Sequence, residues 1–385
     1  MPEAARPQSP HSSDGQAYVL FENDLEGEVL AFTDPLEHLV AHDADDVLPM
    51  LQRAQALRER GAWIAGYLSY EAGYALDPAL QPFMPDNRLL PLLHLAAFEK
   101  PSSPLPAASG QATLGAAEPR WLLDEYRERF AILHDHIARG DCYQANLTFP
   151  FQQDWSGSPL SLFATMRARQ PVRYAALVEL GGPTILSRSP ELFFKSDADG
   201  WIETHPMKGT MPRGKNAAED RANVDFLKSD VKSQAENRMI VDLLRNDISR
   251  ITEPETLDVP DLFRIETYPT VHQMVSTVRA RLLPQTGLAE IMQALFPCGS
   301  VTGAPKISAM KILRKLETGP RGAYCGAIGW AAPDGTAQFN VAIRTLSLFD
   351  DGEAVLNAGG GIVFDSKAES EYDEALLKAR FASLG

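Results

Sequence analysis

The chain has 385 residues and a formal net charge of −15 at pH 7, with 51 acidic against 36 basic side chains. This balance argues against a general nucleic-acid or anionic-membrane surface, because phosphate groups attract positively charged faces. An anionic substrate would need positive charge from Arg, Lys, backbone N–H groups or a metal ion. The three cysteines, Cys142, Cys298 and Cys325, are widely spaced. They predict a reduced, cytoplasmic protein without a zinc site or disulfide framework.

The N-terminal region, residues 16–100, is expected to combine strands with one long helix. Residues 1–15 are rich in Pro, Ser and Ala and lack an apolar stretch, so we expect a disordered lead. Strands are predicted from Tyr18 and from Trp63 to Tyr70, with a helix from Asp46 to Gly61 between them.

A compositional change then separates this region from the remaining chain. Residues 101–119 are loaded with Pro, Ser, Ala and Gly, which predicts a linker or long surface loop. Apolar residues from Leu122 to Ile137 recur at three- and four-residue spacing, and Gly140 lies where a helix end favours glycine. A strand is predicted from Tyr143 to Phe151. We expect residues 120–385 to form a single core.

Two predicted helices carry carboxylates on faces that also hold other functional groups. Glu236 lies one turn before Ile240, so it shares a face with apolar residues. Glu371, Glu374 and Lys378 fall on one face of a helix near the C-terminus. Two carboxylates from separate helices suit Mg²⁺, which takes oxygen ligands and keeps several waters. A solvated face with an internal Glu–Lys pair is the alternative, and it is favoured for Glu371 and Lys378 taken alone.

Two glycine-rich segments could approach an anion. Gly359 and Gly360 belong to a run of three glycines whose N–H groups could contact an oxyanion, although such a run is more often a turn. Gly299-Ser-Val-Thr-Gly-Ala-Pro-Lys departs from phosphate-loop spacing but is expected to lead into a helix. We expect Thr302 near the helix cap and Pro305 in the first turn, where an anion is favoured.

Lys208 is a candidate nucleophile because of its surroundings. It lies among Pro, Met and Gly in the segment Pro206-Met-Lys-Gly-Thr. A lysine that is desolvated in such a setting has a lowered pKa and can attack an electrophilic carbon. A solvent-exposed lysine on a surface loop is the commoner interpretation of the local sequence alone.

These segments resemble, in both string and order, the chorismate-utilising enzymes, which include anthranilate, aminodeoxychorismate, isochorismate and salicylate synthases. The resemblance runs from about Trp121 to the C-terminus. It is carried by Gly140-Asp-Cys-Tyr-Gln-Ala-Asn-Leu, Ser189-Pro-Glu, Pro206-Met-Lys-Gly-Thr, Glu236 through Asp247, Thr270-Val-His, Gly299-Ser-Val-Thr-Gly-Ala-Pro-Lys, Arg321-Gly-Ala-Tyr-Cys-Gly, Ala342-Ile-Arg-Thr-Leu, Ala358-Gly-Gly-Gly-Ile and the Glu371 helix. It implies an α/β (α+β) fold with two large, mostly antiparallel sheets packed as a sandwich with outer helices.

The resemblance also implies a set of site residues. It assigns Mg²⁺, which would hold the ring carboxylate of chorismate, to Glu236 and Glu374, with Glu371 beside them. It assigns Lys208 and Glu191 to catalysis. It assigns the remaining substrate contacts to Arg344 and Tyr324 at the enolpyruvyl carboxylate, and to His272, Thr302, Gly359, Gly360, Gln144, Thr210 and Lys378 around the pocket.

Two positions distinguish the branches of the family. Family members that add water carry lysine where this chain has Gln144, and anthranilate synthases carry alanine where it has Lys208. Both positions favour amination of chorismate at C4, giving 4-amino-4-deoxychorismate for para-aminobenzoate and folate synthesis. The resemblance implies that Lys208 attacks C2 while the C4 hydroxyl leaves with help from Glu191. Ammonia would then displace the lysine.

The source of ammonia is expected to be a partner protein. A glutaminase needs a nucleophilic cysteine in a Gly-x-Cys-x-Gly turn, and none of the three cysteines has that context. We therefore expect a glutamine amidotransferase subunit as partner, or ammonia from solution. The alternatives are an anthranilate synthase component and a catalytically silent chorismate-binding subunit. Three departures from the family are Met207, in place of the more usual isoleucine, Cys298, in place of a glycine, and Ser233, in place of a common acidic residue.

Overall fold

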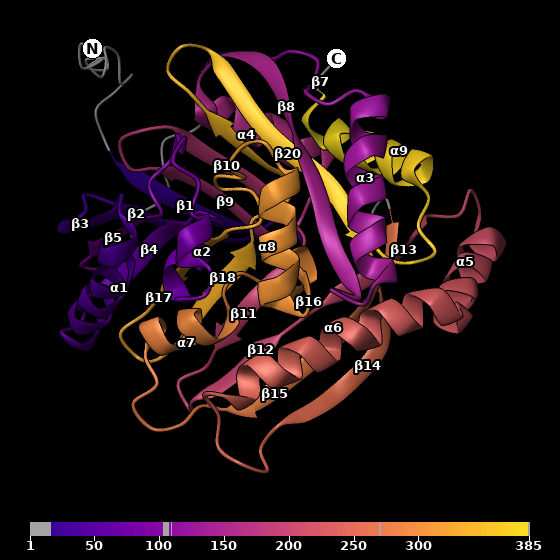
Figure 1. Cartoon of the computed structure of the whole chain (residues 1–385). Helices are drawn as coiled ribbons and strands as arrows, with labels where there is room; N and C mark the ends of the chain where they lie inside the picture. Colours follow the sequence, from indigo (N-terminus) through magenta and orange to yellow (C-terminus); the bar gives the residue numbers. More distant parts are fainter. Residues whose placement is uncertain (1–16, 103–107, 109, 269–270, 384–385) are drawn as a thin grey trace.

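The structure is a computed structural model that describes residues 17–102, 108, 110–268 and 271–383. The expected disordered lead, residues 1–15, lies outside the described residues. Two ten-stranded sheets dominate the described part of the chain (Figure 1). All the paired strands in both sheets are antiparallel. The predicted fold class is therefore confirmed.

The first sheet is built around the long strand β8. Its order is β16-β8-β20-β19-β10-β9-β1-β2, and β6 and β7 also pair with β8. Its strands are β1 (Tyr18–Asn23), β2 (Glu28–Thr33), β6 (Ala112–Leu114), β7 (Glu118–Pro119), β8 (Gln144–Gly157), β9 (Tyr174–Glu179), β10 (Thr184–Ser189), β16 (Gly303–Ala304), β19 (Thr345–Leu348) and β20 (Glu353–Ile362). Within the expected linker, residues 101–119, the short strands β6 and β7 thus attach to the sheet.

The second sheet has the order β13-β15-β12-β11-β18-β17-β4-β5-β3, and β14 pairs with β15. Its strands are β3 (Glu37–Ala41), β4 (Trp63–Leu68), β5 (Leu93–Phe98), β11 (Leu192–Ser196), β12 (Trp201–Thr204), β13 (Met207–Pro212), β14 (Asp258–Thr267), β15 (Val271–Arg281), β17 (Ala327–Ala331) and β18 (Ala337–Val341). The N-terminal region, residues 16–100, therefore contributes strands to both sheets, with β1 and β2 in the first and β3 to β5 in the second.

Helices cover the outer faces and the ends of the sheets. They are α1 (Ala44–Glu59), α2 (Ala72–Leu76), α3 (Leu123–Ala138), α4 (Pro159–Arg169), α5 (Ala217–Ser229), α6 (Val231–Ser249), α7 (Leu288–Leu295), α8 (Lys306–Leu316) and α9 (Ala368–Ala379), with 3₁₀ turns at Gln81–Phe83, Gly299–Val301 and Arg380–Ala382. Helix α3 packs beside α9, and α6 crosses β13 and β15 (Figure 1). Among the described helices, none is both long and apolar enough to cross a bilayer.

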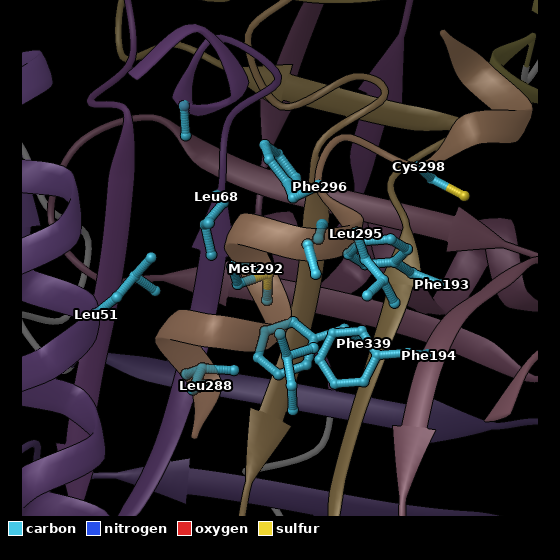
Figure 2. Packing of buried hydrophobic residues seen from close by; sticks show 14 of the residues in the cluster. Leu51, Leu68, Phe193, Phe194, Leu288, Met292, Leu295, Phe296, Cys298 and Phe339 are labelled. Carbon is cyan, nitrogen blue, oxygen red and sulfur yellow. The ribbon is translucent and has the colours of Figure 1, made fainter. Parts of the chain in front are cut away.

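Apolar packing joins the layers. One buried cluster combines residues of the first sheet, such as Phe32 and Val178, with residues of the second, such as Phe98 and Ile328. A larger cluster packs α7 against the second sheet, and Figure 2 shows Leu288 and Leu295 of α7 together with Phe194 and Phe339 of that sheet. The first of these clusters joins the two sheets, and the second fixes α7 on the second sheet.

The structure contains the helices that the sequence predicts, but the two glycine-rich segments have another conformation than the one predicted. Gly140 follows α3 with a φ of 81°, the left-handed conformation expected of a glycine after a helix. The glycine run is not a turn but the end of strand β20, paired with β8. Helix α8 begins at Lys306 with Pro305 as its N-cap, so Thr302 lies in the preceding turn instead of at the cap. Both differences arise because pairing with β8 holds the glycines and Gly303 extended.

Candidate active site

Lys208 projects from strand β13 and not from a surface loop. The register of β13 against β15 shifts between Met207 and Thr210, so Lys208 lies within a bulge, which re-aims a side chain. Gly209 follows with a φ of 90°, and a Cβ added there would lie 2.8 Å from the Cβ of Ser233 on α6. The backbone beside Lys208 is thus pressed closely against α6, and Gly209 permits that approach.

Four charged side chains act on the Lys208 amine. Burial lowers the pKa of Lys208 first, and the nearby Lys378 ammonium lowers it further. The carboxylates of Glu236, Glu191 and Glu374 act in the opposite direction, yet the net pKa is lowered. We call these five residues the charged cluster. Its arrangement favours a neutral, nucleophilic amine on Lys208.

Glu191 is a buried carboxyl with a free oxygen. It lies between β10 and β11 with 5% of its surface exposed, and its Oε1 has no hydrogen-bond partner. Burial raises the pKa of Glu191 to about 7, against the lowering effects of the Ser300 hydroxyl and of Lys208, Arg344 and Lys378. A carboxyl with such a pKa can both donate and accept a proton near neutral pH.

Helices α6 and α9 each contribute a carboxylate to the charged cluster. The Glu374 carboxylate pairs with the Lys378 ammonium at 2.7 Å, and the Glu236 carboxylate lies 3.8 Å from the Lys232 ammonium. Burial would raise the pKa of Glu374, but the Lys378 ammonium outweighs it and the net pKa lies below the ordinary value. Glu374 is therefore ionised near neutral pH and remains available as a hard oxygen ligand.

The glycine end of β20 forms one wall of this site. The Lys378 ammonium donates to the Gly359 carbonyl oxygen at 2.9 Å. A Cβ added at Gly360 would lie 3.0 Å from Glu371 Oε2. Glu371 itself accepts from the Ser366 hydroxyl at 2.7 Å, and burial raises its pKa. Among the described residues, no group of three or more His, Cys, Asp or Glu side chains is arranged to hold a metal ion.

Gln144 faces the same wall. A Cβ added at Gly361 would lie 2.4 Å from Gln144 Nε2 and 3.3 Å from Lys208 Nζ. Gln144 is 2% exposed, and its Oε1 has no hydrogen-bond partner. A buried amide oxygen without a partner is costly, so this atom is suited to a ligand that donates a hydrogen bond.

Arg344 lines a pocket beside Glu191. The pocket is lined by Gln170, Pro171, Val172, Pro190, Tyr268, Val271, Gln273 and Arg344. Arg344 has a φ of 51°, and burial lowers its pKa while Tyr268 and Glu191 oppose this effect. The Thr210 hydroxyl donates to the Gln273 side-chain oxygen at 3.1 Å, which links β13 to this pocket. A guanidinium in this position can hold a carboxylate next to Glu191.

Three other predicted substrate contacts have partners elsewhere. The ring nitrogens of His272 lie 2.9 Å from Asp220 Oδ1 and 2.9 Å from the Thr267 hydroxyl. The Thr302 hydroxyl donates to the Cys298 carbonyl oxygen at 3.1 Å. Tyr324 lines a second pocket on the side of Thr345 and Asn357, among other residues. The described contacts do not join these side chains to the charged cluster, and their substrate roles stay predictions.

A buried arginine fastens several of these segments together. The Arg321 guanidinium donates to both Glu317 oxygens, at 2.7 and 2.8 Å, and to the carbonyl oxygens of Val301 at 2.9 Å and Asn146 at 2.7 Å. The Glu71 carboxylate accepts from the Arg321 backbone N–H at 2.7 Å. Arg321 thus connects the N-terminal region to the turn before β16 and to the strand that carries Gln144.

Sequence reasoning missed Arg321, Ser300 and Gln273 as site residues. Ser300 and Arg321 belong to the sequence motifs that carry the family resemblance, so their position in these motifs could have indicated a role near the site. Gln273 follows His272 directly and alternates with it on β15, which places its side chain on the opposite face, in the Arg344 pocket. Their contacts span distant segments and are visible only in the folded chain.

The two antiparallel sheets and the charged cluster around Lys208 are the features that the comparisons with known proteins can be set against. The family described as chorismate binding enzyme matches residues 16–383. This protein therefore belongs to the chorismate binding enzymes. Anthranilate synthase component I from Streptococcus pneumoniae has the same fold, with a TM-score of 0.80 at 24% identity, covering 99% of this chain and 95% of that one.

Curated relatives include two kinds of chorismate enzyme. Aminodeoxychorismate synthase component 1 of Salmonella typhimurium is 41% identical over 254 residues, covering 66% of this chain and 56% of the relative. Anthranilate synthase component 1 of Streptomyces coelicolor is 33% identical over 395 residues, covering 90% of this chain and 76% of the relative. The match to aminodeoxychorismate synthase of Streptomyces pristinaespiralis, at 41% identity, spans 36% of that relative. The matches thus span about half or less of the length of these aminodeoxychorismate synthases.

Proposed function

We propose that this chain aminates chorismate at C4 to give 4-amino-4-deoxychorismate, the synthase step of para-aminobenzoate and folate synthesis. The observation that carries the proposal is Lys208, whose pKa is lowered by burial and by Lys378 within the charged cluster that also contains Glu191. The 41% identity to an aminodeoxychorismate synthase component 1 supports the same reaction. A nucleophilic lysine beside a proton-carrying carboxyl is the pair that displacement of a ring hydroxyl requires.

The proposed reaction has two displacement steps. The Lys208 amine forms a bond to C2, the ring double bonds shift, and the C4–oxygen bond breaks. Glu191 gives its proton to the departing hydroxyl, which leaves as water. Ammonia then bonds to C4, the double bonds shift back, and the C2–nitrogen bond breaks to release the lysine as an amine. The new C4 ammonium returns a proton to the Glu191 carboxylate, so the net change is chorismate plus ammonia to product plus water.

Other residues of the chain would position the substrate. Arg344, facing Glu191, would hold one carboxylate through parallel N–H bonds. Glu236 and Glu374 both act on Lys208, and two carboxylates suit Mg²⁺, which completes its shell with water and substrate oxygens. We propose that they hold this ion, which would supply positive charge to polarise the ring carboxylate. Lys378 would then release Glu374 while keeping its bond to the Gly359 carbonyl.

The ammonia donor is proposed to be a separate glutamine amidotransferase. Cys142, Cys298 and Cys325 are all buried, and none stands in a nucleophile turn. Burial raises the pKa of Cys142 to about 11 and that of Cys298 and Cys325 to about 12, so all three remain thiols near neutral pH. These thiols are poor candidates for attack on glutamine, because the thiolate is the nucleophile.

Anthranilate synthesis is the alternative function. The match to an anthranilate synthase component 1 covers 90% of this chain, more than the 66% covered by the Salmonella relative. Lys208 argues against it, because an amine at that position occupies the C2 face that ammonia would have to attack to give the ortho product. A silent chorismate-binding subunit is disfavoured by the complete charged cluster.

One incubation separates these functions. The purified chain is mixed with chorismate, Mg²⁺ and an ammonium salt, and the products are identified by chromatography and mass spectrometry. We expect 4-amino-4-deoxychorismate. Anthranilate would instead support the alternative, and unchanged chorismate would support a silent subunit. In a parallel incubation glutamine replaces ammonium, and turnover without a second protein would contradict the proposed partner.

A further inference from the structure

A buried ion pair contacts the segment between α4 and β9. Arg188 on β10 and Asp24, directly after β1, have side chains that are 0% and 2% exposed. One nitrogen of the Arg188 guanidinium, Nη2, donates to Asp24 Oδ2 and, at 3.0 Å, to the Gln170 carbonyl oxygen. Asp24 Oδ2 also accepts from the Val172 backbone N–H at 2.7 Å, and the Asp24 backbone N–H donates to the Val172 carbonyl oxygen at 2.9 Å. The pair therefore holds this segment at two points.

The segment and Arg344 line the same pocket. Gln170, Pro171 and Val172, which we call the pocket wall, line one part of it. Arg188 also contacts Arg344, because its backbone N–H donates to the Arg344 carbonyl oxygen at 2.9 Å. Arg344 has a φ of 51°, a left-handed conformation that a non-glycine residue keeps only where its surroundings fix it. Arg188 thus connects the pocket wall, through its side chain, with the backbone of Arg344.

We propose that Asp24 and Arg188 are positioning residues, which hold the pocket wall and Arg344 at a fixed separation and so set the affinity of the pocket for a substrate carboxylate. Neither residue is among the described residues that line the pocket, so each acts through others. The proposal deepens the proposed function, because it rests on Arg344 holding a carboxylate of chorismate. A guanidinium holds a carboxylate through two parallel bonds, so a small displacement of its backbone or of the facing wall weakens binding.

The Asp24 carboxylate matters because the buried Arg188 charge has few other partners. Arg188 Nε and Nη1 have no hydrogen-bond partner among the described residues, and Glu22 Oε2 lies 3.8 Å from Nη1. The guanidinium carbon lies 5.1 Å from the centre of the Phe163 ring. Asp24 Oδ1 is shared with the exposed Arg167, whose Nε lies 3.3 Å away. Asp24→Asn would keep the shape of the side chain but remove the charge that neutralises Arg188, and the contact with the pocket wall would loosen.

The first test compares chorismate affinity in Asp24→Asn with that in a matched control. The Kd is measured by isothermal titration calorimetry with Mg²⁺ and without ammonia, and KM and kcat are measured with an ammonium salt. Asp24→Asn should raise the Kd and the KM by roughly fivefold and keep kcat, because a charge-assisted hydrogen bond becomes a weaker neutral one. Glu26→Gln, in the same hairpin, is the control, since its pair with Arg173 is 52% and 35% exposed, and it should keep the wild-type Kd. An unchanged Kd in Asp24→Asn, or equal rises in both variants, would overturn the proposal.

A second variant separates positioning from stability. Asp24→Asn combined with Arg188→Met removes both buried charges, and apolar replacement of a buried ion pair is often neutral or stabilising. Urea denaturation measures this stability. The pocket wall still lacks the Arg188 donor to the Gln170 carbonyl, so the double variant should fold stably and keep the raised Kd. A return of the Kd to the wild-type value would show that the pair acts only through stability, and would overturn the proposal.

Arg344→Lys links the effect to the pocket. If Asp24 acts through the Arg344 pocket, Asp24→Asn should raise the Kd much less in Arg344→Lys than in the wild-type chain, because coupled sites are not additive. Full additivity would overturn the proposal, and so would an unchanged Kd in Arg344→Lys alone. The proposed function fails separately, by a product other than 4-amino-4-deoxychorismate, and the chorismate affinities can be measured in that case as well.

Discussion

Arg321→Lys should destabilise the folded chain strongly while keeping the buried charge. The Arg321 side chain is 2% exposed and its partner Glu317 is 9% exposed, so solvent does not screen the pair. The guanidinium makes four hydrogen bonds, two to Glu317 and one each to the carbonyls of Val301 and Asn146. A lysine ammonium is a point charge that cannot reproduce this fork. At least one charge-assisted bond is lost and one buried carbonyl is left unsatisfied.

We expect the free energy of unfolding to fall by about 2–4 kcal/mol, the cost of one such bond plus one unsatisfied group. The assay is urea denaturation monitored by circular dichroism. An unchanged slope of the unfolding free energy against urea concentration would show that only stability has changed. Arg53→Lys is the matched control, because its pair with Glu37 is bidentate but 41% and 36% exposed. It should cost clearly less than Arg321→Lys, because solvent screens an exposed ion pair. Equal losses in both variants would show that burial of the Arg321–Glu317 pair does not increase its contribution to stability.

Three further predictions concern the metal, the substrate and pH. Glu236→Gln and Glu374→Gln should each raise the Mg²⁺ and chorismate concentrations needed for half-maximal rate, because each removes an anionic ligand; an unchanged Mg²⁺ titration in both would remove them as ligands. Arg344→Lys should raise the KM for chorismate by roughly tenfold, and an unchanged KM would exclude Arg344 from the site. Burial raises the pKa of Glu71 from 4.5 to about 7, so the free energy of unfolding should lose about 3 kcal/mol as pH rises from 4.5 through 7. Glu71→Gln should flatten that part of the stability profile, and an identical profile would contradict the assignment.

Much of the fold could be predicted from local sequence. The spacing of apolar residues from Leu122 to Ile137 identified α3, and Gly140 identified its end. Helices α6 and α9 were placed correctly because their carboxylates and apolar residues recur with helical spacing. These signals are short-range, and packing of the amphipathic face reinforces them instead of overriding them.

The site was harder to predict because its geometry depends on distant segments. The local sequence around Lys208 predicts a surface loop. Pairing of β13 with β15, and the bulge in that pairing, instead place Lys208 inside the charged cluster. The run of three glycines predicts a turn, but ten successive residue pairs with β8 hold β20 in an extended conformation. Arg321 meets carbonyls that are 20 and 175 residues away in the sequence. No local pattern encodes such contacts.

The proposed function depends on a covalent bond between Lys208 and the chorismate ring during turnover. The most direct measurement traps the wild-type chain with chorismate and Mg²⁺ in the absence of ammonia, then determines its intact mass and the modified peptide. We predict an adduct of chorismate less water on the peptide that contains Lys208. Lys208→Ala should show neither the adduct nor most of the C4-aminated product. An unmodified wild-type chain, together with full C4 amination by Lys208→Ala, would exclude Lys208 as the nucleophile.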